Sequence, residues 1–182
     1  MIICVTGKIG TGKSTISRFF EKKGFHYINM DVFGHEAFQE NIEKIAQAFG
    51  ETDRKKISEI VFSAPEKLKL LESIVHPTMM KMLDEELERL KGKDVIIEAA
   101  IKRRLGIDCC DLTITVLSDP EMIKKRLKKR YTPEKIDEIL KQQTDVIEEG
   151  IVVRNDGTIE ELYTKLKNLF EEKIVKSRHG SA

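Results

Sequence analysis

The chain has 182 residues, and its 32 basic and 31 acidic residues give a formal net charge of +1 at pH 7. This length allows one substantial core with a helical insertion and does not by itself indicate two independent domains. The balanced, interleaved charges favour a solvated helical surface over a surface for nucleic acid. No apolar run has the length of a membrane helix and no signal-peptide layout is present, so we expect a cytoplasmic protein without membrane contact.

The three cysteines, Cys4, Cys109 and Cys110, have no spacing typical of a metal site. Cys4 lies in an apolar segment, where a small buried thiol packs well. A reducing compartment is the simplest interpretation of this pattern.

A full P-loop pattern runs from Gly7 to Ser14. The apolar residues 2–5 precede it, and apolar residues at helical spacing follow it, which gives the order of strand, loop and helix that the pattern requires. A chance glycine-rich turn is the alternative, and the flanking strand and helix argue against it.

The residue types in this loop suit phosphate binding for separate reasons. Glycines let backbone amides turn inward around phosphate oxygens, and the following helix presents its positive end to the same anion. The Lys13 ammonium can bridge the β- and γ-phosphates, and the Ser14 hydroxyl can bind Mg²⁺. We therefore expect ATP and Mg²⁺ as ligands. The residues expected to contact the nucleotide here are Gly10, Thr11, Gly12, Lys13, Ser14 and Thr15.

The rest of the chain alternates between apolar segments and helical patterns. Further strands are predicted at residues 25–30, 94–100, 112–117 and 151–153. Helices are predicted at residues 35–49, 54–62, from 65 to a break at His76-Pro77, from 79 to 91, at 121–130, at 134–148 and after a capping box at 158–161. This order predicts an α/β P-loop kinase fold, with a five-stranded parallel sheet flanked by helices.

We expect a single domain, 1–182, with three regions. The core comprises about residues 1–34, 93–120 and 149–176. A mostly helical acceptor lobe comprises about residues 35–92, and a lid comprises about residues 121–148.

The lid is predicted from its basic residues and its break at Tyr131-Thr132-Pro133. Arg126 and Arg130 lie four residues apart and would project from one face of one helix. Such a pair suits a mobile lid over phosphates, and an ordinary basic surface hairpin is the alternative.

Two carboxylates follow predicted strands. Asp31 lies where open α/β sheets place their ligands, so it is a candidate to orient an acceptor hydroxyl and accept its proton. A structural carboxylate that caps a turn is the alternative. Glu98 is a candidate to hold Mg²⁺ through water, and a buried structural role is its alternative.

The sequence around the P-loop separates the main classes of P-loop protein. The guanine-specific pattern Asn-Lys-x-Asp is missing, no strand ends in a Walker B aspartate, and the chain is too short for a large ATPase assembly. Among the classes of P-loop protein, these features favour a kinase that phosphorylates a small acceptor.

Along nearly its whole length the sequence resembles the dephospho-CoA kinases. Residues 6–15 are similar to the phosphate loop Thr-Gly-Gly-Ile-Gly-Ser-Gly-Lys-Ser of that family, and residues 29–31 to its Asp-Ala-Asp. Residues 53–62 are similar to its Asp-Arg-x-x-Leu-x-x-x-Val-Phe block, and residues 71–77 match its Leu-Glu-x-Ile-x-His-Pro. Among the departures, Lys141 stands about where the family has a lid arginine.

The resemblance implies ATP-dependent phosphorylation of the ribose 3′-hydroxyl of dephospho-CoA, the last step of coenzyme A biosynthesis. It implies catalytic roles for Lys13, Asp31 and Arg130. A nucleotide or other small-metabolite kinase, and an ATP-binding regulatory module without catalysis, are the alternatives.

The resemblance also implies contacts to the two substrates. Arg126 and Asn155 would contact the nucleotide, and Arg54 and His76 would contact the acceptor together with Asp31. A His before Pro that locks a loop is the alternative for His76, and an ion pair is the alternative for Arg54. The expected partner is a small molecule, and the expected state is a monomer or a weak homo-oligomer.

Overall fold

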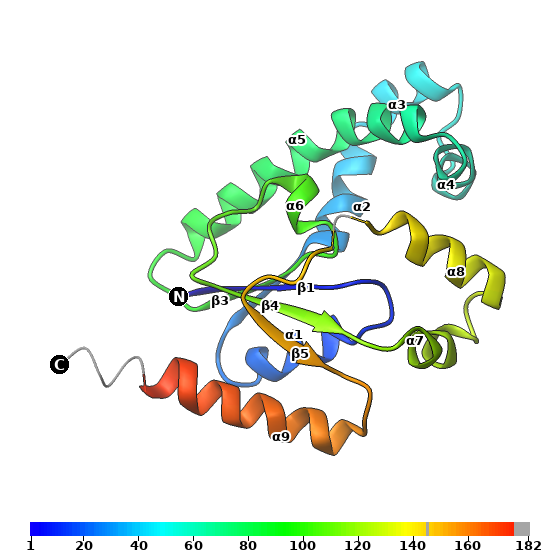
Figure 1. The fold of residues 1–182 in the computed structure, drawn as a ribbon. Coiled ribbons are helices and arrows are strands. Elements are labelled where there is room, and N and C mark those ends of the chain that lie inside the picture. The colour runs from blue at the N-terminus through cyan, green and yellow to red at the C-terminus, as the bar shows by residue number, and fades with distance from the viewer. Residues whose placement is uncertain (145, 177–182) are drawn as a thin grey trace. The chain divides into compact units, whose positions relative to one another are not determined.

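The computed structural model describes residues 1–144 and 146–176. Its strands are β1 (Ile2–Thr6), β2 (His26–Asn29), β3 (Val95–Glu98), β4 (Leu112–Leu117) and β5 (Ile151–Arg154). They form a five-stranded sheet in the order β2-β3-β1-β4-β5 (Figure 1). β1 pairs in parallel with β3 and with β4, and β4 pairs in parallel with β5. The predicted fold class is confirmed.

The contacts between residues divide the chain into two compact units. The core unit comprises residues 1–28 and 92–182, and the helical unit comprises residues 29–91. The helices of the core unit are α1 (Lys13–Glu21), α6 (Lys102–Leu105), α7 (Pro120–Leu127), α8 (Pro133–Gln142) and α9 (Ile159–Leu169), and a π-helical segment, Phe170–Val175, follows α9. The helices of the helical unit are α2 (Met30–Glu40), α3 (Ile42–Phe49), α4 (Arg54–Phe62) and α5 (Pro65–Arg89).

In the core unit, one hydrophobic cluster joins α1 and α9 to the sheet. Phe19 and Phe20 of α1 pack with Ile3 and Val5 of β1 and with Leu166 of α9. Side chains two residues apart on a strand point to the same face, so Ile3 and Val5 place both helices on that face. This cluster fixes the two elements that the P-loop connects.

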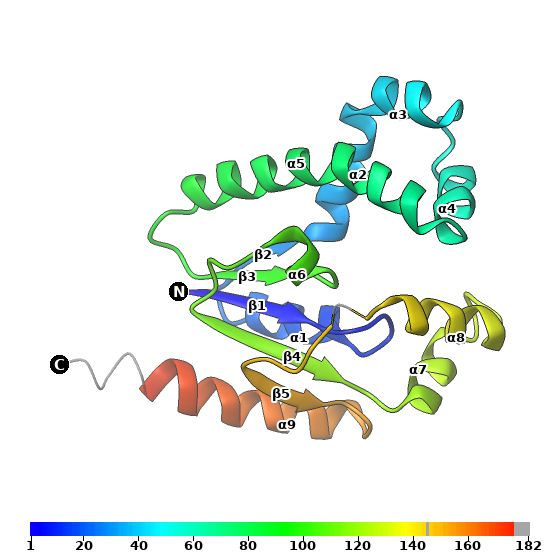
Figure 2. The same ribbon diagram turned by 45° about the horizontal axis from the view of Figure 1, so that its top comes forward.

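In the helical unit, α5 packs against α2, α3 and α4 and forms the long helix in Figure 2. Two predictions are wrong here. α5 continues through Pro77, because its packing on three helices outweighs the one N–H that proline lacks. The predicted helix at 35–49 is interrupted at Asn41, whose buried side chain donates hydrogen bonds to the Ala37 carbonyl and to Thr78 Oγ1 at 2.9 and 2.8 Å.

The lid helices are shorter than the sequence predicts. α7 ends at Leu127, where the Leu127 carbonyl accepts hydrogen bonds from the amides of Arg130 and Tyr131 in a turn. Arg130 therefore lies beyond the helix, and the prediction that Arg126 and Arg130 share one helical face is wrong. α8 ends at Gln142 rather than at 148, and residue 145 of the predicted helix lies outside the described residues.

Cys4 is fully buried, as expected, but the expectation that it is a free thiol is wrong. Cys4 and Cys110 form a disulfide with Cα atoms 5.7 Å apart, a usual separation for such a bond. Parallel pairing of Ile3 with Leu112 brings the two cysteines together. Cys109 is exposed and lies outside this bond. Within the described residues, no helix is both long and apolar enough to cross a membrane.

Candidate active site

The P-loop connects β1 to α1, and its glycines meet two requirements. Gly12, the N-cap of α1, has a φ of 101°, and a Cβ there would collide with the side-chain amide of Asn155. A Cβ on Gly7 would lie 2.5 Å from the carbonyl oxygen of Val116. The backbone conformation and the lack of space therefore both require glycine at these positions.

Lys13 lies folded over this loop. Its side chain is buried, and Nζ donates a hydrogen bond to the Lys8 carbonyl oxygen at 3.1 Å. Thr11 is also buried, and its hydroxyl donates to the same carbonyl at 2.8 Å. Thr15 lies in the first turn of α1, where its amide donates to the Gly12 carbonyl. The ammonium is thus held beside the loop amides, where a phosphate group would bind.

A buried carboxylate lies next to the P-loop serine. Glu98, the last residue of β3, is 4% exposed, and its Oε1 accepts a hydrogen bond from Ser14 Oγ at 2.7 Å. The hydroxyl of Tyr27 donates to Oε2. Hydroxyl donors on both oxygens offset the cost of burying this group. Tyr27 is not predicted from the sequence, because only the adjacency of β2 and β3 in the sheet brings it to Glu98.

Ser14 and Glu98 supply oxygen ligands, which Mg²⁺ prefers. Among the described residues, no group of three or more His, Cys, Asp or Glu side chains forms a metal site of its own. The pair therefore fits an ion that takes its remaining ligands from water and from substrate phosphates, as Mg²⁺ commonly does.

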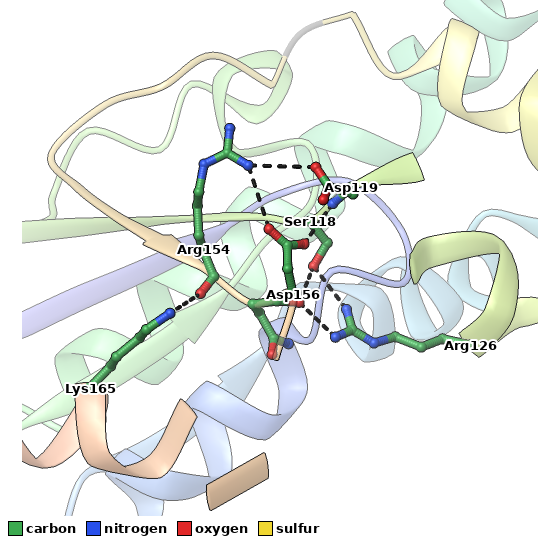
Figure 3. A network of polar contacts seen from close by, with 7 residues as sticks. Ser118, Asp119, Arg126, Arg154, Asp156 and Lys165 are labelled. Atoms are coloured by element: carbon green, nitrogen blue, oxygen red, sulfur yellow. Dashed lines mark hydrogen bonds and ion pairs between the residues drawn. The ribbon is translucent and has the colours of Figure 1, made fainter. Parts of the chain in front are cut away.

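Arg126 ties α7 to the P-loop and to the segment after β5, and Figure 3 shows its contacts with Ser118 and with that segment. Its guanidinium donates to the Gly10 carbonyl at 3.1 Å, to Ser118 Oγ at 2.8 Å and to the Asn155 carbonyl at 2.6 Å. Asn155 is buried, and its Nδ2 donates to the Thr11 carbonyl at 2.8 Å. The structure thus brings together four residues that were predicted to contact the nucleotide.

Arg154 forms polar contacts beside this network, as Figure 3 shows. Arg154 lies 3.7 Å from Asp119 and 3.5 Å from Asp156, and Lys165 Nζ donates to the Arg154 carbonyl at 2.9 Å. Exposed pairs contribute little stability one by one. Together they hold the segment that presents Asn155 to the P-loop.

The lid helices α7 and α8 pack against each other through a small apolar core of Ile123, Leu127 and Ile136. Lys124 lies 3.0 Å from Asp137 across this pair, and that hydrogen bond raises the pKa of the lysine. Arg130 is exposed in the turn between the helices. Its predicted catalytic role stays a prediction.

Asp31, Arg54 and His76 all belong to the helical unit. Asp31 is exposed in the first turn of α2, and its amide donates to the N-cap oxygen of Asn29 at 2.9 Å. Arg54 begins α4, with its guanidinium 2.7 Å from His35 Nδ1. His76 is half-buried within α5, so the alternative of a locked loop is wrong. Their roles toward an acceptor stay predictions.

The family model for dephospho-CoA kinase matches residues 1–161. The chain belongs to the dephospho-CoA kinase family. The dephospho-CoA kinase of Fusobacterium nucleatum is 33% identical to it over 94% of this chain and 97% of the relative. That of Leptospira interrogans serovar Lai is 36% identical over 93% of this chain and 91% of the relative. Members of this family are phosphotransferases with an alcohol group as acceptor, and the family identified from the sequence is confirmed.

Solved structures show the same fold. The crystal structure of a Thermus thermophilus protein is similar to this chain, with a TM-score of 0.77 and 29% sequence identity. The match covers 95% of this chain and 97% of the Thermus chain. The structure of the dephospho-CoA kinase from Campylobacter jejuni has a TM-score of 0.68 and 21% sequence identity to this chain. The match covers 94% of this chain and 96% of the Campylobacter chain. The second likeness concerns the fold alone.

Proposed function

We propose that this protein transfers the γ-phosphate of ATP to the ribose 3′-hydroxyl of dephospho-CoA and releases CoA and ADP. The observation that carries the proposal is the P-loop of the core unit, in which Lys13 lies over the loop and Ser14 contacts the buried Glu98. Membership of the dephospho-CoA kinase family supports the choice of acceptor.

On the nucleotide side, the loop amides and the N-terminus of α1 bind phosphate oxygens. The Lys13 ammonium exchanges the Lys8 carbonyl for oxygens of the β- and γ-phosphates as charge develops there. Ser14 and Glu98 would hold Mg²⁺, which would supply charge neutralisation on the phosphates. Arg126 and Asn155, which contact Gly10 and Thr11, orient the nucleotide.

On the acceptor side, Asp31 accepts the proton of the 3′-hydroxyl, and Arg54 and His76 hold other acceptor groups. Arg130 places a guanidinium on the transferred phosphoryl group, where its planar donors match the oxygens. We further propose that the protein works in the cytoplasm, where its co-substrate ATP is available, as a monomer or a weak homo-oligomer.

An assay of acceptor-dependent ADP formation tests this function. The purified protein is incubated with ATP, Mg²⁺ and either dephospho-CoA or a panel of nucleosides and other small alcohols. We expect rapid ADP release with dephospho-CoA and a product heavier by one phosphoryl group. Faster turnover of another acceptor, or ADP release that no acceptor stimulates, would contradict the proposal.

A further inference from the structure

One apolar side chain of the P-loop packs into the lid. Ile9 is half-buried and contacts the core that Ile123 and Leu127 of α7 form with Ile136 of α8. Leu140 of α8 packs on the same core. Among the described residues of this cluster, Ile9 alone comes from outside the two lid helices. The lid therefore completes its small core with a side chain of the loop that it covers.

Polar groups beside this side chain also contact the end of α8. The Ile9 amide donates a hydrogen bond to Gln143 Oε1 at 2.8 Å, and Lys8 Nζ donates to the Leu140 carbonyl at 3.3 Å. Neither bond uses the side chain of Ile9. A substitution of that side chain therefore tests the apolar contact with these hydrogen-bonding groups still present.

Leu127 connects the lid core to the turn that contains Arg130. A Cβ on Gly10 would lie 3.1 Å from the Leu127 side chain, so this leucine lies directly on the loop. The Leu127 carbonyl accepts hydrogen bonds from the amides of Arg130 and Tyr131 at 2.8 and 3.1 Å. The backbone of Arg130 is thus held by a residue whose side chain belongs to the core that Ile9 enters.

We propose that Ile9 is a positioning residue that docks the lid on the P-loop and thereby sets the place of Arg130. Ile9 packs against the core that contains Leu127, and Leu127 holds the turn that carries the arginine. The inference rests on the proposed function in one respect, that Arg130 acts on the transferred phosphoryl group.

Hydrogen exchange followed by mass spectrometry tests the docking on the protein without ligand. We expect the amides of α8 to exchange about 5- to 20-fold faster in Ile9→Ala than in wild type, because the truncation removes apolar contacts that hold the lid closed. Ile9→Val loses one methyl group and should stay within about twofold of wild type. Ile159→Ala is the matched control, since Ile159 is 45% exposed at the start of α9.

Turnover and ATP binding test whether the docking serves Arg130. At saturating ATP and dephospho-CoA, Ile9→Ala should lower kcat by about 5- to 20-fold, with the calorimetric ATP affinity within about threefold of wild type. The loop residues expected to contact the nucleotide, 10–15, are unchanged in this variant. In an Arg130→Ala background the same substitution should lower kcat by less than about twofold, because two changes that act on one group are not additive.

Faster exchange in the lid, with a loss of kcat that disappears in the Arg130→Ala background, supports the proposal. If Ile9→Ala does not fold by circular dichroism, Ile9→Thr repeats the test with a β-branched side chain that carries a polar hydroxyl. Wild-type exchange in α8, equally faster exchange in α9, normal kcat, weakened ATP binding or an undiminished loss in the Arg130→Ala background would each overturn it. A wild-type protein that does not phosphorylate dephospho-CoA would overturn the proposed function, and the exchange measurement would still decide whether Ile9 docks the lid.

Discussion

The core unit and the helical unit hold their predicted site residues in different ways. In the core unit, Ser14 bonds to Glu98 and Arg126 bonds to Gly10, across 84 and 116 residues of chain. In the helical unit, the amide of Asp31 bonds to Asn29, two residues away, and Arg54 contacts His35, 19 residues away. The first arrangement fixes several elements around one loop, whereas the second leaves side chains on the ends of helices.

Burial separates the best-placed residues of the two units, although Arg130 of the core unit is exposed and His76 of the helical unit is half-buried. Lys13 and Glu98 are buried, while Asp31 and Arg54 are exposed. A preorganised site lowers the barrier of phosphoryl transfer through positioning and electrostatics. The contacts of Ser14 and Arg126 hold several elements around the P-loop, whereas Asp31 and Arg54 lie on the acceptor side of the proposed reaction. Substitutions in the two units should therefore damage different steps.

The largest effect is expected at Lys13. Lys13→Ala should lower turnover by about 10³-fold or more with the fold retained, because its charge acts mainly on the transferred phosphate. Steady-state kinetics with ATP and dephospho-CoA measures the loss, and circular dichroism checks the fold. Lys22→Ala, an exposed lysine at the other end of α1, is the control. Normal turnover by a folded Lys13→Ala protein would show that the P-loop does not take part in the reaction.

A smaller loss is expected in the turn after α7, which contains Lys128 and Arg130, both exposed. Arg130→Ala should lower kcat by about 10- to 100-fold, because a guanidinium fork matches phosphate oxygens in a way that lysine does not. Lys128→Ala is the matched control, with kcat expected within about twofold of wild type, as for other surface changes. Equal, small effects of the two substitutions would show that this segment is an ordinary solvated surface.

The smallest effect is expected at Tyr27, which acts through Glu98. Tyr27→Phe removes one hydroxyl donor from the carboxylate, so the Mg²⁺ concentration for half-maximal activity should rise by about 3- to 10-fold at saturating ATP. Titration of Mn²⁺, followed by its paramagnetic resonance in the presence of ADP, measures the same change without turnover. Tyr163→Phe is the control, since Tyr163 packs beside Phe19. An unchanged metal dependence would make the Tyr27 contact structural only.

Local patterns predicted much of the fold. The helix at 54–62 and the capping box at Thr158 and Glu161 match the structure, because both depend on neighbouring residues. The P-loop was identified from its own residues and the strand and helix beside it. The break predicted at Pro77 failed because packing on other helices decides whether α5 continues.

The contacts between distant segments could not be predicted. Tyr27 reaches Glu98 only through the order of the strands, and Gln143 reaches Ile9 only because the lid lies on the loop. Cys4 and Cys110 are brought together by strand register, which the spacing of cysteines does not reveal. Each of these contacts joins segments that no local pattern relates.

The division between the two units is tested most directly by Asp31→Asn. The amide keeps the shape of the side chain but cannot accept the proton of the acceptor hydroxyl. Calorimetry of ATP binding and mass spectrometry of the product with dephospho-CoA are measured on the same preparation of mutant and wild type. We predict wild-type ATP affinity together with loss of transfer by about 10²- to 10⁴-fold. A fully active Asp31→Asn protein, or one that has lost ATP binding, would contradict the assignment of acceptor chemistry to the helical unit.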